Sequence, residues 1–272
     1  MSRIIAIHDL SLWSKSSLSV VLPVLEAMNH EVFILPTTIL STQSDGFENL
    51  LEVDMSKNLE SFYDRVKSYG YSFDAVYSGY LGKPETVSAV KRIMERENAF
   101  SLVDPVLGDN GQLYQGLGKE NISSLLTLVG KADVITPNIT EAALLTGLNM
   151  QSSYSNPEIK TLVSKLREIG PERGIITSVP LSLGKLSNIA YDADEIRIFA
   201  FEDLAVSYPG SGDLFASLFI SIFLSGYSFF PSVKMSGEIT SRAIRYAKES
   251  ERERRMGISL IPVMEDIRKV TL

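Results

Sequence analysis

Residues 100–109 read FSLVDPVLGD, and the prediction of the fold starts from this segment. The mostly apolar stretch Phe100–Val103 is typical of a short buried strand. It ends in Asp104, which Pro105 restrains toward an extended backbone, and Gly108 permits a tight turn before Asp109. Carboxylates at the carboxyl end of a parallel strand lie where open α/β sheets bind ligands. The segment therefore predicts a strand and a candidate site, with an ordinary Asp-rich loop as the alternative.

On both sides of this segment, strand-like and helix-like stretches alternate. Predicted helices cover residues 18–28, 59–69, 85–98, 122–129, 140–146 and 158–169. Predicted strands cover residues 4–7, 32–35, 75–77, 100–103, 134–135 and 174–177, and residues 36–46 are predicted to be a polar loop. Pro23 predicts a kink or a late start of the first helix. The alternation indicates an α/β fold with a mostly parallel sheet covered by helices on both faces.

After Ser178 the pattern changes. Residues 186–191 and 195–199 predict consecutive strands joined by a hairpin at residues 192–194. Three helical segments follow, at residues 214–224, 233–250 and 263–270. No internal repeat, low-complexity tract or Gly/Ser linker interrupts the chain, so we expect one domain over residues 1–272.

The composition excludes several classes of function. With 33 acidic against 26 basic residues, the net charge of −7 argues against a broad electrostatic contact with nucleic acid or an anionic membrane. The absence of cysteine removes thiol nucleophiles, zinc fingers and iron–sulfur clusters. Because His8 and His30 are the two histidines of the chain, a multi-histidine metal site or a Ser-His-Asp hydrolase is not expected. Carboxylates, hydroxyls, backbone groups and a hard cation remain as the available chemistry.

The apolar runs are short. The run near the N-terminus is too short for a signal peptide, and the longest run, residues 214–224, falls short of the ~20 residues that span a bilayer. We therefore expect a cytoplasmic protein with no membrane contact.

Residues 209–213, Pro-Gly-Ser-Gly-Asp, run directly into the apolar segment 214–224. Gly210 and Gly212 on either side of Ser211 let backbone N–H groups converge at the start of a helix, an arrangement that binds phosphate. Asp213 would then lie beside the bound anion. The alternative is that the glycines form a turn and Asp213 only caps the helix. A Walker loop and a dinucleotide fingerprint are excluded, because neither Gly-Lys-Ser/Thr nor Gly-x-Gly-x-x-Gly is completed.

Residues 135–141, Ile-Thr-Pro-Asn-Ile-Thr-Glu, form a second strand end that leads into a helix. Asn138 and Glu141 have the spacing of a capping box, which would explain both residues structurally. However, Asp104 and Glu141 would lie at strand ends of one sheet. Mg²⁺ commonly binds one or two carboxylates while it keeps waters and phosphate oxygens, so this pair could also hold a hydrated divalent cation.

In this order, Asp-Pro-Val-Leu-Gly-Asp, Ile-Thr-Pro-Asn followed by glutamate, and Gly-Ser-Gly-Asp resemble the motifs of the ribokinase-like superfamily. Within it, the chain is most similar to the vitamin B6 (pyridoxal, pyridoxine and pyridoxamine) kinases, over nearly its whole length. The resemblance implies a three-layer α/β/α sandwich and a homodimer. It also implies ATP-dependent phosphorylation of the vitamer's primary alcohol to its 5′-phosphate.

The resemblance also implies a role for each matching residue. Asp213 is the catalytic base, and the N–H groups around Gly210, Ser211 and Gly212 form the anion hole. Asp104 and Glu141 organise Mg²⁺ and an associated monovalent cation such as K⁺. The positions that meet the ATP phosphates, or belong to the segment that closes over them, are Asn138, Thr177, Ser178, Asp109 and Tyr114. Phosphoryl transfer needs positioning and charge neutralisation more than covalent chemistry, which suits a chain without cysteine.

The substrate end departs from the family pattern. Family members often carry glycines after the first strand, whereas no glycine precedes Gly46 here. The positions that contact the substrate ring fall near Asp9 and Ser44, although Ser44 also fits a plain turn. Trp13 could stack on a ring or fill the core, and we expect the core. His8 is either a structural residue or a ligand contact, and His30 is expected at the surface.

Two other functions stay open. Hydroxymethylpyrimidine (phosphate) kinases share the core, but their glycine-rich first loop and reactive cysteine region are not found here, which favours a B6 kinase. A catalytically silent vitamin-binding homologue is the third possibility. The intact Asp213 argues against it, and the altered first loop keeps it open.

Overall fold

The computed structural model describes residues 1–181 and 185–270. The α-helices are α1 Leu18–Ala27, α2 Leu59–Lys67, α3 Pro84–Glu97, α4 Lys119–Val129, α5 Ile139–Thr146, α6 Asn156–Ile169, α7 Ser211–Leu224, α8 Phe229–Glu249 and α9 Met264–Lys269. The strands are β1 Arg3–Ser11, β2 Glu31–Leu40, β3 Glu52–Asp54, β4 Ala75–Ser78, β5 Phe100–Val103, β6 Gly108–Asp109, β7 Gln112–Leu113, β8 Val134–Ile135, β9 Arg173–Leu181, β10 Lys185–Tyr191 and β11 Ile196–Glu202. Short 3₁₀ turns, η1 Arg254–Met256 and η2 Ile261–Val263, precede α9.

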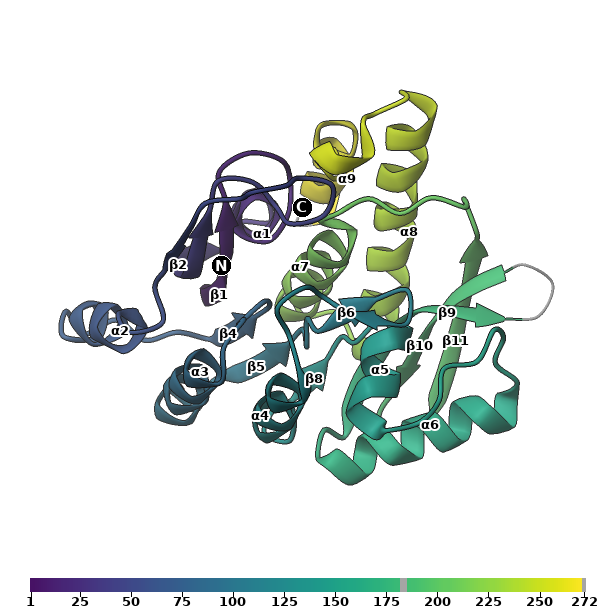
Figure 1. Ribbon diagram of the computed structural model, residues 1–272, viewed down its shortest axis with the longest axis horizontal. Coiled ribbons are helices and arrows are strands. Elements are labelled where there is room, and N and C mark those ends of the chain that lie inside the picture. The colour runs from purple at the N-terminus through teal and green to yellow at the C-terminus, as the bar shows by residue number, and fades with distance from the viewer. Residues whose placement is uncertain (182–184, 271–272) are drawn as a thin grey trace.

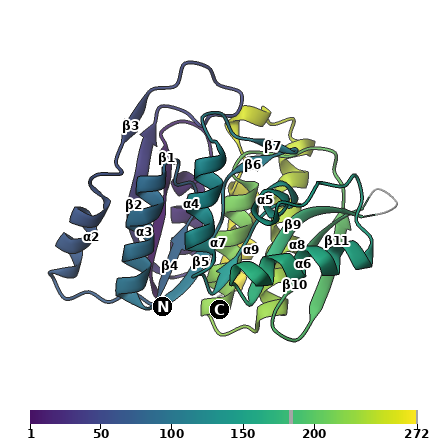
Figure 2. The ribbon, with the colours of Figure 1, turned by 60° about the horizontal axis from the view of Figure 1, so that its bottom comes forward.

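One sheet of nine strands organises the molecule, in the order β11-β10-β9-β8-β5-β4-β1-β2-β3. The six central strands from β9 to β2 run parallel, whereas β10 pairs antiparallel with both β9 and β11 on one edge, and β3 pairs antiparallel with β2 on the other. Because consecutive parallel strands need crossover connections, helices alternate with the strands and cover both faces (Figures 1 and 2). The predicted three-layer α/β/α architecture is confirmed.

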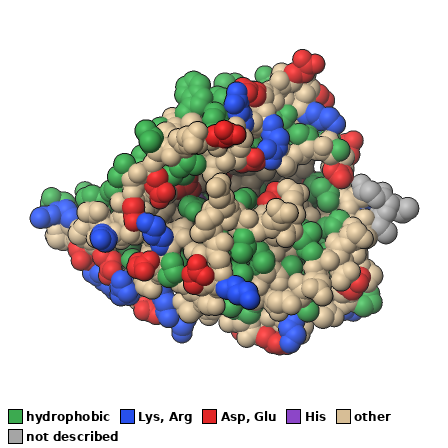
Figure 3. All heavy atoms as spheres, viewed as in Figure 1, with side chains coloured by type: hydrophobic (Ala, Val, Ile, Leu, Met, Phe, Trp, Pro, Cys, Tyr) green, Lys and Arg blue, Asp and Glu red, His purple; other side chains and the backbone are tan. Residues whose placement is uncertain are grey.

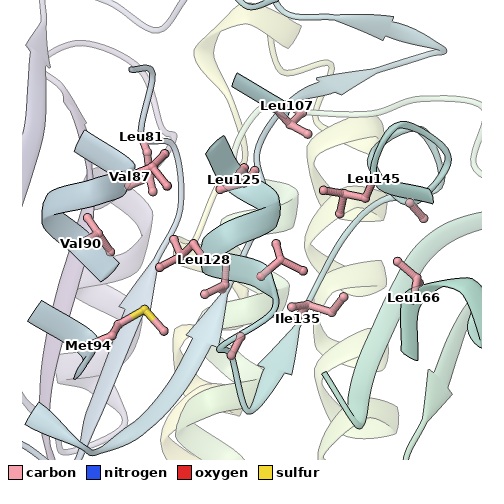
Figure 4. Close-up of a cluster of buried hydrophobic side chains, with 14 of the residues drawn as sticks. Leu81, Val87, Val90, Met94, Leu107, Leu125, Leu128, Ile135, Leu145 and Leu166 are labelled. Carbon is pink, nitrogen blue, oxygen red and sulfur yellow. The ribbon is translucent and has the colours of Figure 1, made fainter. Parts of the chain in front are cut away.

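The alternation of side chains along each strand supplies a separate core for each face. In β1, Ile5 and Ile7 contribute to the core beneath α2–α6, whereas Ile4 and Ala6 contribute to the core beneath α1, α7 and α8. Figure 4 shows part of the first core, in which side chains of α3, α4 and β8 meet. Strands that are apolar on both faces need a helical layer on each side, and so this pattern fixes the sandwich.

Several element boundaries differ from the sequence prediction. The strand β2 continues to Leu40 and pairs with β3 there, so the loop predicted at 36–46 begins later. Pro36 is tolerated because β3 pairs only with Thr38–Leu40, leaving one side of Pro36 without a strand neighbour. The helix α1 starts at Leu18 and contains Pro23, so the late start is wrong. His30 is buried rather than at the surface, and its Nδ1 accepts the Ser2 N–H at 3.4 Å.

Among the described residues, no helix combines the length and the apolar character needed to cross a membrane.

Candidate active site

Four acidic side chains from distant parts of the chain gather at the carboxyl ends of the parallel strands. Asp9 lies near the end of β1, Asp104 directly follows β5, Glu141 lies in the first turn of α5, and Asp213 lies in the first turn of α7. Asp9, Asp104 and Glu141 are buried, and the Asp213 side chain is 13% exposed. The molecule is hollowed on this side, between the chain entering α7 and the β6 hairpin (Figure 3).

The start of α7 is open toward this hollow. Gly210 occupies the N-cap position with a φ of 84°, and a Cβ there would lie 2.6 Å from the Lys15 carbonyl oxygen, so only glycine fits. A Cβ on Gly212 would meet nothing within 4 Å. The Ser211 N–H donates to the Tyr208 carbonyl at 3.2 Å. The N–H groups of Gly212 and Asp213, in the first turn, are therefore those best placed to meet an anion.

Asp213 does not cap its own helix. Its Oδ2 accepts the backbone N–H of Ser17 at 2.7 Å, which joins the start of α7 to the start of α1. Burial raises the pKa of the Asp213 carboxyl to about 6, although the Ser17 N–H lowers it in part. A carboxylate with a pKa just below neutral is ionised at pH 7 and still basic enough to accept a proton. The capping alternative for Asp213 is wrong.

Asp9 is also hydrogen-bonded to Ser17. The hydroxyl of Ser17 donates to Asp9 Oδ1, and Ser17 is itself buried. Burial raises the pKa of Asp9 to about 7, the Ser17 hydroxyl lowers it, and the charge of Asp213 raises it further. The structure thus brings the predicted substrate-end carboxylate next to the predicted base. The sequence analysis missed Ser17, whose only visible signal was its position before a helix.

Asp104 and Glu141 form the second half of the acid cluster. Burial, followed by the charges of Glu141 and Asp213, raises the pKa of Asp104 well above its ordinary value. Burial also raises the pKa of Glu141 to about 8, although the N–H groups of Asn138 and Leu107 donate to it at 2.8 and 3.1 Å. Buried carboxylates that repel one another are stabilised by a cation, so this pair fits Mg²⁺.

The described residues contain no group of three or more His, Cys, Asp or Glu side chains placed to hold a metal ion. A cation here would therefore take its remaining ligands from water and phosphate, as Mg²⁺ commonly does.

Asn138 and Glu141 form the predicted capping box at the start of α5. The Asn138 side chain accepts the Glu141 N–H at 2.9 Å and donates to the Gly108 carbonyl at 2.8 Å, so its amide fastens the β6 hairpin to α5. Glu141 therefore combines a structural role with a place in the acid cluster. The two interpretations do not exclude each other.

Thr177 and Ser178 lie in β9, where its register with β10 shifts. Ser178 has a φ of 57°, which is typical of a bulge that redirects side chains near a site. The Thr177 N–H donates to the Pro137 carbonyl at 2.8 Å, which places this bulge beside the start of α5. The sequence prediction ended this strand at Thr177 and did not include the bulge.

Asp109 and Tyr114 lie on or beside a small hairpin formed by β6 and β7. Its turn residues, Asn110 and Gly111, both have positive φ, as a two-residue hairpin requires. Tyr114 is partly exposed, and burial followed by the charges of the surrounding acids raises its pKa. The hairpin thus borders the acid cluster.

Two other residues considered for the substrate end, Ser44 and Trp13, are exposed. Ser44 is exposed, and no described interaction joins it to Asp9 or Asp213. Trp13 is 60% exposed, so the expectation that it fills the core is wrong. It lies in the turn between β1 and α1, where the chain leaves the sheet.

A C-terminal segment that the sequence analysis did not connect with the site closes this end. The Lys15 N–H donates to the Met256 carbonyl at 3.1 Å, and the Ile258 N–H to the Pro209 carbonyl at 2.8 Å. Arg254 forms an ion pair with Asp45 at 2.6 Å. The loop before α1, the loop after β2 and the entry to α7 are therefore held by one segment.

A family model described as phosphomethylpyrimidine kinase matches residues 24–257. The chain belongs to this family. The prediction of a ribokinase-like kinase is therefore confirmed at the level of family and fold. Family membership alone does not choose between a B6 vitamer and a hydroxymethylpyrimidine as the substrate.

Some of the relatives are named as pyridoxal kinases, and others are named as phosphomethylpyrimidine kinases. Pyridoxal kinase PdxY of Actinobacillus pleuropneumoniae is 30% identical over 175 residues, a match that spans 57% of this chain and 57% of that relative's length. A Lactobacillus plantarum pyridoxal kinase structure is 30% identical with a TM-score of 0.92, covering 99% of this chain and 98% of that chain.

A Bacteroides thetaiotaomicron structure, described as a candidate phosphomethylpyrimidine kinase, is 32% identical with a TM-score of 0.93, covering 98% and 93% of the two chains. A second crystal form of that protein contains pyridoxal.

Proposed function

We propose that the protein transfers the γ-phosphoryl group of ATP to the primary alcohol of a B6 vitamer, with Asp213 as the general base. The observation that carries this proposal is the position of Asp213. Its carboxylate is held by the Ser17 N–H at 2.7 Å, in the first turn of a helix whose start faces open space. A base and an anion-binding helix start side by side are what phosphoryl transfer to an alcohol requires.

In the proposed reaction the alcohol oxygen forms a bond to the γ-phosphorus, and the bond from that phosphorus to the bridging oxygen of ADP breaks. The alcohol proton passes to the Asp213 carboxylate. The N–H groups of Gly212 and Asp213 are proposed to stabilise the charge that develops on the transferred group, because the Ser211 N–H, predicted to share this role with that of Gly210, already donates to the Tyr208 carbonyl. Burial of Asp213 supports its role, because it raises the basicity of the carboxylate.

Asp104 and Glu141 are proposed to hold Mg²⁺ through its waters, with a monovalent cation such as K⁺ nearby. When bound, Mg²⁺ would neutralise charge on the ATP phosphates. Asn138, Thr177 and Ser178 are proposed to border those phosphates, and Asp109 and Tyr114 to close over them. The Asn138 amide is already engaged with Gly108 and Glu141, which favours an indirect role for it through the hairpin.

Asp9 is proposed to bind a polar group on the vitamer ring, and Ser44 is a second candidate contact. A homodimer in the cytoplasm is proposed from the family resemblance. Hydroxymethylpyrimidine phosphorylation is the second candidate function, favoured by the description of the family model. The B6 assignment is favoured by the pyridoxal found with the Bacteroides protein and by the chain's lack of cysteine.

The test is an ATP-consumption screen over pyridoxal, pyridoxine, pyridoxamine and hydroxymethylpyrimidine, with Mg²⁺ present. We expect turnover of at least one B6 vitamer above that of hydroxymethylpyrimidine. Preferential use of hydroxymethylpyrimidine would reassign the substrate but keep the kinase. No turnover of any of the four, by folded protein, would favour a silent vitamin-binding homologue.

A further inference from the structure

Ser17 occupies the N-cap position of α1 but does not cap it. Serine is among the preferred N-cap residues because its hydroxyl normally accepts an N–H of the first helical turn. Here the Ser17 side chain makes no such bond, and the backbone has a φ of 49° and a ψ of −131°. A residue other than glycine in this region is strained. Ser17 therefore lacks the usual capping hydrogen bond and has a strained backbone.

The two donors of Ser17 contact two different acids instead. Its backbone N–H donates to Asp213 Oδ2 at 2.7 Å, and its hydroxyl donates to Asp9 Oδ1. Its carbonyl oxygen accepts the N–H groups of Val20 and Val21 at 2.8 and 2.9 Å, which fixes the residue to α1. One residue therefore connects the first strand, the first helix and the start of α7, although Ser17 and Asp213 are 196 positions apart.

This arrangement fixes one oxygen of each carboxylate. Because Ser17 donates to Oδ1 of Asp9 and to Oδ2 of Asp213, one oxygen of each acid is oriented by the same residue. Donation to a carboxylate also favours its charged form, which burial disfavours for both acids. The distance between a ring-binding group and the base sets whether a bound alcohol reaches the base.

We propose that Ser17 is a positioning residue that orients Asp9 for the substrate ring and Asp213 for the alcohol, its hydroxyl serving Asp9 and its backbone N–H serving Asp213. This inference rests on the proposed function, because it gives those two acids their roles. The two roles of Ser17 can be tested separately, because a substitution removes the hydroxyl that contacts Asp9 but leaves the backbone N–H that contacts Asp213.

The kinetic test uses Ser17→Ala, Ser17→Gly, Asp9→Asn and Ser17→Ala/Asp9→Asn, with the substrate that the wild-type protein turns over. Loss of the hydroxyl should raise the KM for that substrate roughly tenfold and leave kcat and the KM for ATP within about threefold. In the Asp9→Asn background, Ser17→Ala should add little, because the hydroxyl acts through Asp9. Ser19→Ala is the matched control, because in the part of the chain that the structure describes the Ser19 hydroxyl, in the first turn of α1, bonds only to its neighbours Ser14 and Ser16.

The glycine variant distinguishes positioning from backbone strain. Glycine adopts the φ of 49° without penalty, so Ser17→Gly should be more stable than Ser17→Ala. If the serine mattered only for the loop conformation, Ser17→Gly would restore the wild-type KM and the proposal would be overturned. Additive effects of Ser17→Ala and Asp9→Asn on KM would overturn it as well.

A second measurement needs no substrate and separates this inference from the proposed function. Titration of the aspartate carboxyls by ¹³C NMR should show that Ser17→Ala raises the pKa of Asp9, whose facing titratable groups are Asp213 and Tyr80, and leaves that of Asp213 nearly unchanged. An unchanged pKa of Asp9 would overturn the proposal. Wild-type protein that turns over no substrate, together with the expected NMR shift, would overturn the proposed function but keep the link through Ser17. A wild-type KM in Asp9→Asn would also overturn the proposal, because Asp9 would then not contact the substrate.

Discussion

The Nδ1 atom of His8 lies 4.0 Å from Oδ1 of Asp213, yet the two side chains do not form an ion pair. His8 is fully buried, and burial lowers its pKa to about 3, so the imidazole is neutral near pH 7. Its ring packs edge-on against Tyr77, with the ring centroids 4.4 Å apart. Asp213 therefore has a neutral neighbour on this side and the Ser17 N–H on the other. Burial, rather than a cation, governs its basicity.

We predict that His8→Asn leaves the acidic limb of the kcat/KM profile almost where it is in the wild-type protein. The wild-type limb should lie near pH 6, because Asp213 must be ionised and burial raises its pKa to about 6. Removing a neutral imidazole should move the limb by less than about half a unit, whereas removing a cation would raise it by roughly 1 unit or more. A pH–rate profile measures this, with thermal melting to exclude unfolding. A clear upward shift would mean that His8 is charged.

Above pH 6.5, the protein should become less stable as the pH rises. Burial raises the pKa of Asp9 to about 7 and that of Glu141 to about 8, so the folded protein holds protons that the unfolded chain has released. The free energy of unfolding must therefore fall as the pH rises through these values. Burial lowers the pKa of His8 and His30 below the ordinary 6.5, which gives an opposite trend, but only below that pH.

The melting temperature without Mg²⁺ should therefore drop by several degrees between pH 6.5 and 8.5. Asp9→Asn should reduce the slope, because it removes one of the raised groups. Mg²⁺ with ATP should flatten it, because the cation binds more tightly once these carboxylates are ionised and therefore stabilises the folded state most at high pH. A melting temperature that is constant or rises over this window would show that these acids are ionised with little cost.

Asp104→Asn and Glu141→Gln should each shift the Mg²⁺ activation curve to higher concentration, by about tenfold or more. Asp104→Asn should even raise the melting temperature of the metal-free protein, because the repulsion by Glu141 disappears. Asn138 and Leu107 donate to different oxygens of Glu141, and Glu141→Gln keeps only one of these two acceptors, so the start of α5 should persist with a loss of about 1–3 kcal/mol.

The control is Glu158→Gln, which changes the same position of a capping box at the start of α6. It should leave the Mg²⁺ dependence unaltered. Equal Mg²⁺ curves for all three variants would leave Glu141 with its capping role alone and remove Asp104 from the metal site.

Local sequence signals predicted the fold and the strands that end in acidic or capping residues. The apolar runs of β1, β5 and β8 are short and buried on both faces, and the carboxylates or caps that follow them are adjacent in sequence. The end of α5 at Gly147, with a φ of 69°, also follows from a local rule. Such features need only neighbouring residues, and for that reason one sequence suffices to predict them.

Features that depend on packing between distant segments could not be predicted in this way. Ser17 would be expected to cap α1, and only the docking of α1 against α7 turns its two donors toward Asp9 and Asp213. The exposure of Trp13 and the ion pair of Arg254 with Asp45 likewise depend on how loops meet. The strand β3 was missed because its three residues are all exposed and carry no buried face.

Asp213→Asn is the decisive substitution for the proposed mechanism. Asparagine keeps an oxygen that can accept the Ser17 N–H, now bonded at 2.7 Å, but it cannot take the alcohol proton. General-base catalysis typically contributes 10²–10⁴-fold, so kcat should fall by roughly that factor. ATP affinity and melting temperature should change little, because the start of α7 and its Gly210 N-cap are intact.

Asp213→Ala makes the complementary test. It removes the acceptor and leaves the Ser17 N–H buried without a partner, which should cost about 1–3 kcal/mol of stability in addition to the lost activity. Asp203→Asn, which changes an exposed acid on the chain leading to α7, serves as the control and should behave as wild type. Steady-state turnover and thermal melting of the three variants separate the two roles of the carboxylate. If Asp213→Asn turned over at the wild-type rate while Asp213→Ala only lost stability, Asp213 would be a structural tie between α7 and α1, and the proton would have to leave by another group.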